Sequence, residues 1–322
     1  AALTKDSAET GVRKAELSLI QAVQQNFLTL LKASEDVKSA EDSVARLQEQ
    51  LKVTTAFYDV GLKPRLDVLQ AESDLASAQD TLLQAKNAVA TQIARLNTLL
   101  DMPLDAGVEY VGQLEYLPCT LGIDAALARA LKDRPDLDIA QKSVEIARKD
   151  KKFTDAAFYP TLGADYDYSR EGNGMSVSGS NLMKTEWSEW SVSASASWKF
   201  FEWGKTVNQS QQASETIKQM EAERRNLEQS AIYEVKSNHL TVGEAAERIG
   251  VTRKALDSAR EAYRMAVARY QAQVGTNYDV LNSQYSLTQA EANLTQALAD
   301  YQLAVANLFV SIGEKNPGLM VN

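Results

Sequence analysis

The stretch that decides the fold is Tyr58-Asp59-Val60-Gly61-Leu62-Lys63-Pro64-Arg65-Leu66-Asp67-Val68-Leu69, because it returns once along the chain. The second copy, 212 positions later, reads Tyr270-Gln271-Ala272-Gln273-Val274-Gly275-Thr276-Asn277-Tyr278-Asp279-Val280-Leu281. The tyrosine and the Asp-Val-Leu triplet keep their spacing in both copies. A period this long is not a short solenoid unit. It predicts a duplicated half, in which a turn leads into a long helix.

The helix expected after each turn carries large apolar residues at every seventh position. These columns are Val68, Leu75, Leu82, Val89 and Leu96, and then Val280, Leu287, Leu294, Tyr301 and Leu308. Small residues follow three positions later, namely Ala71, Ala78 and Ala85, and then Ser283, Ala290, Ala297 and Ala304. This alternation is typical of coiled-coil packing. It also suits an ordinary helical bundle, so it does not say what the helices enclose.

Composition excludes several classes of protein. The 322 residues carry a net charge of −9, so we expect no nucleic-acid partner. The sequence contains no run of 18 apolar residues, so it predicts no transmembrane helix. The chain has one cysteine, Cys119, which excludes an intramolecular disulfide and a Cys-based metal site. Its one histidine, His239, is expected to be a solvated helix residue rather than a ligand or a base. Because the acids fall on plausible solvated helix faces, we expect no enzyme, no metal and no cofactor.

The periodicity predicts long helices separated by two non-helical regions. We expect helices over residues 5–57, 67–100, 123–132, 135–157, 207–272 and 279–312. A proline at position 135 suits a first helical turn. The first non-helical region, 104–122, is expected to hold a strand near Val108–Tyr116. Helices of this length imply a rod or tube rather than a compact domain.

The second non-helical region alternates apolar and polar residues with a period of two. The apolar series are Leu162, Ala164, Tyr166 and Tyr168, and then Val192, Ala194, Ala196, Trp198 and Phe200. Strands with two unlike faces and aromatic ends are typical of a membrane β-hairpin, with Glu171–Glu186 as its external loop. A soluble hairpin packed on the helices is the alternative, although it offers little core for the aromatic residues. In lipid, one hairpin would leave its edges unpaired, so several chains would have to close a barrel.

Two motifs resemble the TolC-like outer-membrane efflux proteins. One is Arg134-Pro135-Asp136-Leu137-Asp138-Ile139-Ala140, followed by Tyr159-Pro160-Thr161-Leu162; the other is Phe200-Phe201-Glu202-Trp203-Gly204-Lys205. The resemblance implies a mainly α fold with a β-hairpin: a long coiled-coil α-helical barrel plus transmembrane β-barrel strands, in a homotrimer with two structural repeats. Because Ala1 aligns with Ala213, beyond the hairpin, the first-repeat strand pair is expected to be missing from this sequence.

The resemblance also implies a division of the chain. The expected parts are first-repeat periplasmic helices at 1–103 with a tip turn at 61–67, a mixed equatorial region at 104–135, a second-repeat helix at 136–158, the transmembrane hairpin at 159–203, second-repeat periplasmic helices at 204–312 with a tip turn at 273–279, and an equatorial tail at 313–322.

The function implied by the resemblance is a passive exit duct in the outer membrane of a Gram-negative bacterium, extending into the periplasm. It would carry exported small molecules or proteins, with a periplasmic adaptor (membrane fusion protein), an inner-membrane transporter and outer-membrane lipid as partners. A soluble coiled-coil scaffold is the alternative, although it leaves the strand pair unexplained.

Three sets of site residues follow from the resemblance. The periplasmic gate and pore would use Asp67, Tyr270, Asp279 and Asn282. The adaptor contact would use Val60, Gly61 and Leu62 with Val274, Gly275 and Thr276. An aromatic belt would comprise Tyr159, Trp187, Trp190, Trp198 and Trp203. Asp67 and Asp279 also suit the first turn of a helix, where an acid is stabilised by the helix dipole.

The second turn is expected to have a different backbone from the first. Gln273 stands where Gly61 stands in the first copy, and glutamine ordinarily avoids the positive φ that glycine permits. We therefore expect the first turn to carry more of the adaptor contact.

Overall fold

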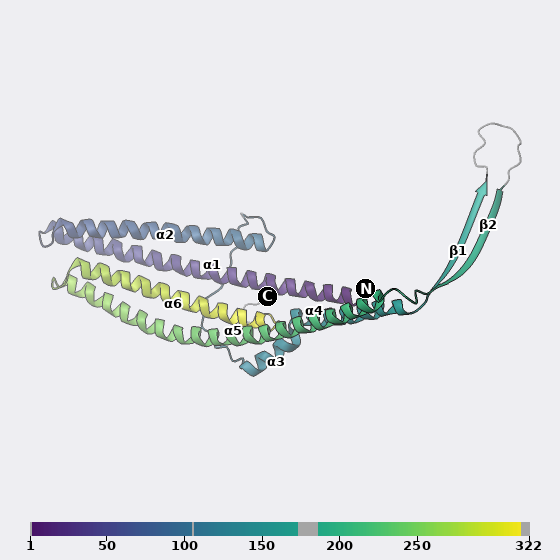
Figure 1. Ribbon diagram of the computed structural model, residues 1–322. Helices are drawn as coiled ribbons and strands as arrows, with labels where there is room; N and C mark the ends of the chain where they lie inside the picture. Colours follow the sequence, from purple (N-terminus) through teal and green to yellow (C-terminus); the bar gives the residue numbers. More distant parts are fainter. Residues whose placement is uncertain (1, 105, 173–185, 317–322) are drawn as a thin grey trace, which may run out of the picture. The chain divides into compact units, whose positions relative to one another are not determined.

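The computed structural model describes residues 2–104, 106–172 and 186–316. Its elements in chain order are α1 (Ala2–Asp59), α2 (Arg65–Leu99), α3 (Ile123–Asp133), α4 (Pro135–Asp155), η1 (Ala156–Phe158), β1 (Thr161–Gly172), β2 (Glu186–Ser197), α5 (Lys205–Gln271) and α6 (Asn277–Ser311) (Figure 1). The described part is therefore mainly helical with one small antiparallel sheet. Among the described helices, none combines the length and the apolar character needed to cross a membrane.

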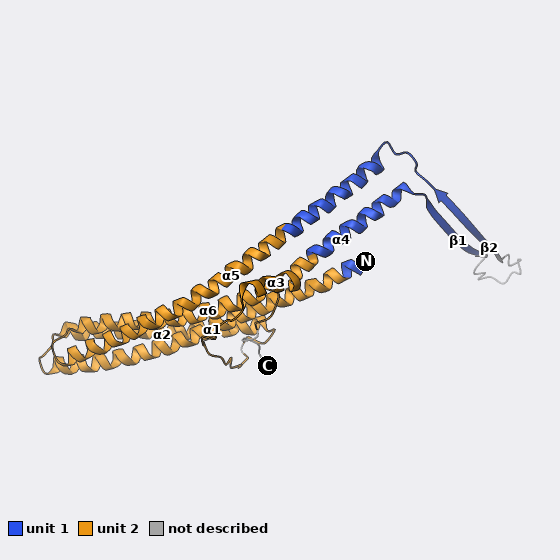
Figure 2. Cartoon of the chain, turned by 90° about the horizontal axis from the view of Figure 1, so that it is seen from below, with its two compact units in different colours: residues 1–5, 140–225 blue, residues 6–139, 226–322 orange. Residues whose placement is uncertain are grey.

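The chain divides into two compact units, one of residues 1–5 and 140–225 and one of residues 6–139 and 226–322 (Figure 2). The larger unit is built from two antiparallel helical hairpins, α1 with α2 and α5 with α6. Helix α6 contacts both α5 and α1, whereas α2 flanks α1. The short helix α3 packs Ala126 and Ala130 on the core that α5 and α6 share.

The contact between α5 and α6 is apolar. Their shared core comprises Val235, Val242, Ala245 and Ile249 from α5, and Ala297, Tyr301, Ala304 and Leu308 from α6. Further along the pair, Leu256 packs with Leu287 and Ala290. Burial of the larger side chains contributes about 1.5–3 kcal/mol each to this contact.

The contact between α1 and α6 is instead crossed by polar pairs, and we call it the polar seam. Four of its hydrogen bonds run from Gln21 Nε2 to Asn307 Oδ1 (3.0 Å), from Arg46 Nη2 to Glu291 Oε2 (2.9 Å), from Gln284 Nε2 to Ser43 Oγ (3.3 Å), and from Gln50 Nε2 to Asn277 Oδ1 (2.8 Å). Arg46 and Glu291 are shielded from solvent, with side chains 22% and 18% exposed, so their ion pair is weakened less by salt than a surface pair.

The two heptad columns have different surroundings, although their sequences correspond. In α6, Val280, Leu287, Tyr301 and Leu308 are all buried. In α2 only Leu96 is buried, and the other four positions are half-buried. In α6, Leu287, Tyr301 and Leu308 of this column pack on the cores shared with α5, whereas no residue of α2 belongs to these cores.

The segment after α2 does not form the strand that we predicted near Val108–Tyr116. Among its described residues, 104 and 106–122, none lies in a strand. Instead, isolated hydrogen bonds hold its backbone on α6: Tyr301 donates its hydroxyl to the Leu117 carbonyl (2.8 Å), and the Cys119 N–H donates to that hydroxyl (2.9 Å). The extended backbone therefore has side-chain partners in place of a neighbouring strand.

Arg134 joins the α3–α4 link to α5 and α6. Its guanidinium donates two hydrogen bonds to the Asp136 carboxylate (3.0 and 2.7 Å), one to Glu234 (2.7 Å) and one to the Ser311 carbonyl (3.0 Å). Burial alone would raise the pKa of Asp136, but the hydrogen bonds and the charge of Arg134 outweigh it and hold this pKa below its usual value. The bidentate pair is the geometry that arginine provides and lysine cannot.

The smaller unit contains η1 and the β-hairpin. The register pairs apolar with apolar residues and polar with polar residues: Leu162 faces Ala196, Ala164 faces Ala194 and Tyr166 faces Val192, while Asp165 faces Ser193. This confirms the predicted alternation and gives the hairpin one apolar and one polar face. Strand β2 ends at Ser197, so Trp198 and Phe200 lie beyond it. Most of the predicted external loop falls outside the described residues, and its ends, Glu171–Gly172 and Glu186, belong to the strands.

Candidate functional site

The two turns that join the helical hairpins have the same backbone. In the first, residues 60–64, the Leu62 N–H donates to the Phe57 carbonyl and the Gly61 N–H to that of Tyr58, both at 2.8 Å. In the second, residues 272–276, the Val274 N–H donates to Arg269 and the Gln273 N–H to Tyr270, both at 3.0 Å. This pair of bonds is the Schellman ending of a helix, which needs a left-handed residue.

The expectation that Gln273 avoids a positive φ is wrong. Gly61 has φ +76° and Gln273 has φ +63°, so the second turn keeps the glycine conformation with a side chain in place. The left-handed conformation costs a non-glycine residue about 1–2 kcal/mol. The hydrogen bonds of the helix ending hold Gln273 in this conformation against its preference.

Lys63 connects the first turn to the second. Its ammonium donates to the Gly275 carbonyl at 3.4 Å and lies 5.1 Å from the centre of the Tyr270 ring. Gly275 is buried, and a Cβ atom there would lie 3.1 Å from the Tyr270 backbone nitrogen. The second turn is therefore packed tightly on the end of α5, with the Lys63 charge over an aromatic face.

Behind the turns, a buried polar cluster ties the two hairpins together. We call Gln50, Thr54, Tyr270 and Asn277 the tip cluster; their exposures are 6%, 0%, 0% and 1%. Gln50 donates to Asn277, the Tyr270 hydroxyl donates to Thr54 Oγ1 (3.3 Å), and Asn277 Nδ2 donates to the backbone carbonyl of Asp67 (3.1 Å). Each helix end at the turns thus contributes to one network. Burial raises the pKa of Tyr270, which keeps its hydroxyl a donor.

The predicted gate residues separate into two groups. Tyr270 and the Asp67 backbone lie in or against the tip cluster. Asp279 and Asn282 are exposed on α6 and lie outside it. Asp279 forms a capping box, in which Thr276 Oγ1 accepts from the Asp279 N–H (3.2 Å) and the Asp279 carboxylate accepts from the Thr276 N–H (3.0 Å). These bonds from Thr276 lower the pKa of Asp279, so the helix-end role is realised in this chain.

Sequence reasoning missed Gln50, Thr54, Lys63 and Asn277. A usable signal existed, since Gln50 and Thr54 are four residues apart and occupy one helix face just before the first turn. Their partner on α6 could not be read from sequence, because it depends on how the two hairpins pack.

The predicted adaptor contacts are mostly at the surface. Val60, Leu62 and Val274 are 68%, 51% and 68% exposed, and Gly61 and Thr276 are also exposed. Gly275 is the exception, since it is buried against α5. The turns therefore present three large apolar side chains to solvent.

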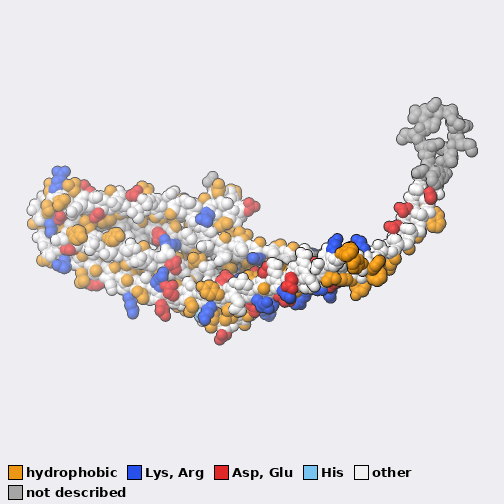
Figure 3. Space-filling view, viewed as in Figure 1, with side chains coloured by type: hydrophobic (Ala, Val, Ile, Leu, Met, Phe, Trp, Pro, Cys, Tyr) orange, Lys and Arg blue, Asp and Glu red, His pale blue; other side chains and the backbone are white. Residues whose placement is uncertain are grey.

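Exposed aromatic residues gather where the hairpin of the smaller unit meets its helices (Figure 3). Of the predicted belt, Tyr159, Trp190, Trp198 and Trp203 are 71%, 68%, 59% and 89% exposed, and for Trp187 only the backbone is described. Sequence reasoning left out Phe158, Phe200 and Phe201, which are also exposed. The Phe201 and Trp203 rings meet edge to face at 5.0 Å, and the Trp198 and Phe200 rings lie 6.3 Å apart. Trp190 lies apart from them, opposite Tyr168 toward the other end of the hairpin.

Within the described residues, no group of histidine, cysteine and acidic side chains could hold a metal ion. The structure therefore offers two turns with exposed apolar side chains above the buried tip cluster, and a hairpin with one apolar face.

Comparison with known proteins decides the family. The model of the outer membrane efflux protein family matches residues 1–101 and 126–314. The chain belongs to this family. Members of this family are outer-membrane proteins, so the chain is located in the outer membrane. The matched family is described by transport rather than by catalysis.

Individual relatives agree with the family assignment. The chain is 25% identical over 161 residues to the probable efflux pump outer membrane protein TtgC of Pseudomonas putida. This match covers 48% of the chain and 32% of that relative. The chain thus spans about a third of the length of the curated relatives it matches.

Solved structures share the fold. The outer-membrane channel OprN superposes with a TM-score of 0.82 at 22% identity, over 97% of this chain and 69% of that one. The outer membrane protein VceC of Vibrio cholerae superposes with a TM-score of 0.80 at 19% identity, over 96% and 73% of the two chains.

Proposed function

We propose that this outer membrane efflux protein is a homotrimeric exit duct, in which helices from each copy enclose a periplasmic passage and strands from each copy contribute to one membrane barrel. The observation that carries the proposal is the β-hairpin. Its register gathers leucine, alanine, tyrosine and valine on one face, and both faces are exposed in a single chain. Lipid would suit the apolar face of the hairpin and water its polar face. Strands from further copies would pair with the open edges of the hairpin.

The soluble scaffold is the weaker reading, because the exposed aromatic group at the hairpin has no use in it. In a membrane protein, aromatic side chains of this kind lie at the boundary between lipid and water. The duct needs no catalytic group, since cargo crosses it passively.

The hairpin supplies a direct test. Ala194→Arg places a charge on the apolar face and should cost about 2–4 kcal/mol near the bilayer midplane. Ser193→Arg is the matched control, because Ser193 lies on the polar face opposite Asp165. We expect Ala194→Arg to reduce the trimer recovered from outer membranes, as seen by native mass spectrometry, while Ser193→Arg leaves it intact. Equal behaviour of the two variants, or a monomer in both, would contradict the duct.

The turns are the proposed place of docking and closure. A periplasmic adaptor, itself linked to an inner-membrane transporter, would contact the apolar side chains Val60, Leu62 and Val274, and the tip cluster would hold the passage closed. Val60→Asp should abolish export while the trimer forms normally. Leu83→Asp is the control, because Leu83 is equally exposed (67%) on α2 but distant in sequence from the turn. Loss of export in both variants would remove the turn from the adaptor contact.

Asp279 and Asn282 are proposed to face the passage, where only Asp279 would carry charge. Three symmetry-related carboxylates would concentrate multivalent cations in a narrow pore. Asp279→Asn keeps the oxygen that the capping box uses and removes the charge. It should weaken block by hexaamminecobalt in single-channel recordings; unchanged block would leave Asp279 with its helix-end role alone.

A further inference from the structure

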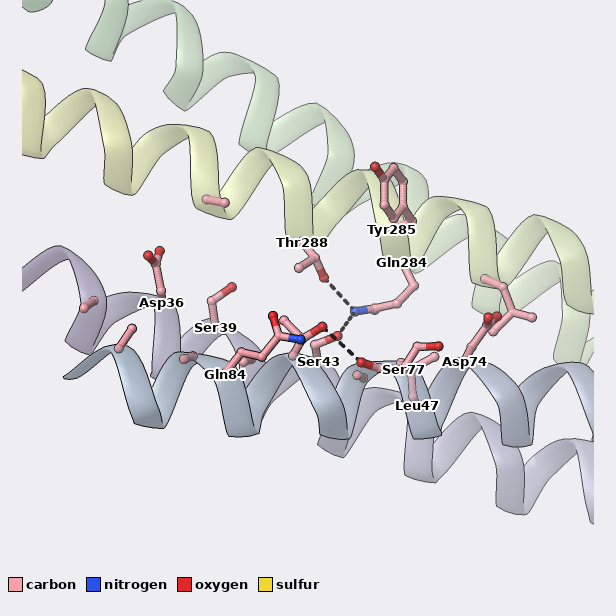
Figure 4. Close-up of a pocket in the computed structure, with 18 of the residues that line it drawn as sticks. Asp36, Ser39, Ser43, Leu47, Asp74, Ser77, Gln84, Gln284, Tyr285 and Thr288 are labelled. Atoms are coloured by element: carbon pink, nitrogen blue, oxygen red, sulfur yellow. Dashed lines mark hydrogen bonds between the residues drawn. The ribbon is translucent and has the colours of Figure 1, made fainter. Parts of the chain in front are cut away.

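A groove runs between α2 and α6 in the larger unit, with α1 as its floor (Figure 4). Its main cavity has a volume of about 830 Å³, and a second cavity of about 350 Å³ lies toward the turns. The two share Asp74 and Leu281 in their walls, so they lie next to each other. Volumes in this range are those of sites that hold drug-sized molecules.

Asp74 is the charged group where the two cavities meet. Among the described residues it has no hydrogen-bond or ion-pair partner, in contrast to Asp36 at the far end of the groove, which pairs with Lys32 at 3.0 Å. Partial burial in the groove raises the pKa of Asp74. An acid that is partly desolvated and lacks a counter-charge would be stabilised by a cation.

The α6 wall of the groove carries two tyrosines and a leucine beside its polar residues. Tyr278, Leu281 and Tyr285 follow one another at a spacing of three and four residues and line one or both cavities. Both tyrosines are 69% exposed, so their rings are open to a ligand rather than used in the protein core. An aromatic face attracts an organic cation, and more strongly where water is excluded.

A buried acceptor also lies in the wall. Gln284 is 4% exposed, and its amide nitrogen donates to Ser43 Oγ (3.3 Å) and Thr288 Oγ1 (3.1 Å). Its carbonyl oxygen has no partner among the described residues. A buried acceptor without a donor is unfavourable, and a positive charge in the groove would be attracted to this oxygen.

We propose that this groove binds an organic cation with an apolar body, with the charge beside Asp74 and the apolar part against Tyr278, Leu281 and Tyr285. Asp74 is the unpaired carboxylate of the groove, because Asp36 is paired with Lys32, and one carboxylate does not suit a small metal ion, which takes several oxygen ligands. An anion would be repelled by Asp74, and Lys32, the cation among the lining residues, is already paired with Asp36. All the lining residues come from one chain, so binding does not need a second copy.

Tetraphenylphosphonium is the probe, and isothermal titration with the intact protein in neutral detergent is the measurement. Asp74→Asn keeps the shape of the side chain and should weaken binding at least tenfold. Glu72→Gln is the control, because Glu72 is an exposed acid on the same helix that lines neither cavity. Tyr278→Leu should weaken binding several-fold, and the neutral analogue triphenylphosphine oxide should bind at least tenfold more weakly than the cation.

The alternatives give different results. Equal loss in Asp74→Asn and Glu72→Gln would show attraction by the acidic surface as a whole and overturn the site. Equal binding of the neutral analogue, or no binding of tetraphenylphosphonium to the unmodified protein, would overturn it as well. Circular dichroism of each variant, expected to be unchanged, separates lost binding from lost fold at these exposed positions.

Discussion

Removal of the Asn277 side chain should loosen the link between the two helical hairpins. Asn277→Ala deletes the hydrogen bonds with Gln50 (2.8 Å) and with the Asp67 carbonyl (3.1 Å). Each is worth about 0.5–1.5 kcal/mol, and a buried group that loses its partner costs about 1–3 kcal/mol more. Gln50 keeps a weaker bond to Thr54 (3.3 Å), which limits its penalty. The expected loss is about 2–4 kcal/mol.

Hydrogen exchange followed by mass spectrometry measures this loss where it occurs. At about 1.4 kcal/mol for each tenfold change, peptides that cover residues 50–67 and 270–281 should lose protection by about 30- to 1,000-fold. The apolar contact between α5 and α6 should keep its protection. Asn282→Ala is the control, since that side chain is exposed on the same helix, and it should change protection little.

Coupling distinguishes a network from separate contacts. If Gln50 and Asn277 act together, Gln50→Ala combined with Asn277→Ala should cost less than the sum of the single changes, by about 1 kcal/mol or more. Strict additivity, or unchanged protection of both turns in Asn277→Ala, would refute the reasoning that the tip cluster ties the hairpins.

Two further outcomes follow from the geometry. Gln273→Gly should stabilise the second turn by about 1 kcal/mol, because glycine adopts the positive φ without strain. The control Gln271→Gly changes the last helical residue of α5 and should destabilise the protein. Thermal melts in which both variants shift in the same direction would contradict the left-handed turn. The stability that Asp136 adds should be present above its ordinary pKa of 3.8 and disappear as the pH falls through its lowered value in the folded protein. Asp136→Asn should therefore melt lower than the unmodified protein at neutral pH and converge with it in acid, and a constant difference down to the lowest pH would place the effect of Asp136 in packing rather than charge.

Sequence periodicity predicted the helices well because long amphipathic segments dominate this chain. The helix expected at 67–100 runs from Arg65 to Leu99, and that expected at 279–312 runs from Asn277 to Ser311. The hairpin was also predictable, because a period of two specifies which side chains share a face.

What the sequence could not supply was the identity of neighbours. Val68, Leu75 and Val89 hold the same places in the repeat as Val280, Leu287 and Tyr301, yet only the α6 residues are buried. Leu287 and Tyr301 pack on cores shared with α5, which the sequence alone does not show. The tip cluster was missed for the same reason. Gln273 was misjudged because an intrinsic preference was outweighed by the hydrogen bonds of the helix ending.

The polar seam gives the two hairpins a fixed setting along their length. Apolar surfaces lose little when one helix slides a short way over another, whereas hydrogen bonds lose most of their strength within about an ångström of misplacement. The bonds of Gln21, Ser43, Arg46 and Gln50 occur at four levels along α1, so a shift of one helical turn, about 5.4 Å, would break them together. The seam thus fixes one register of α1 on α6, and sliding of one helix along the other would lose all four bonds at once.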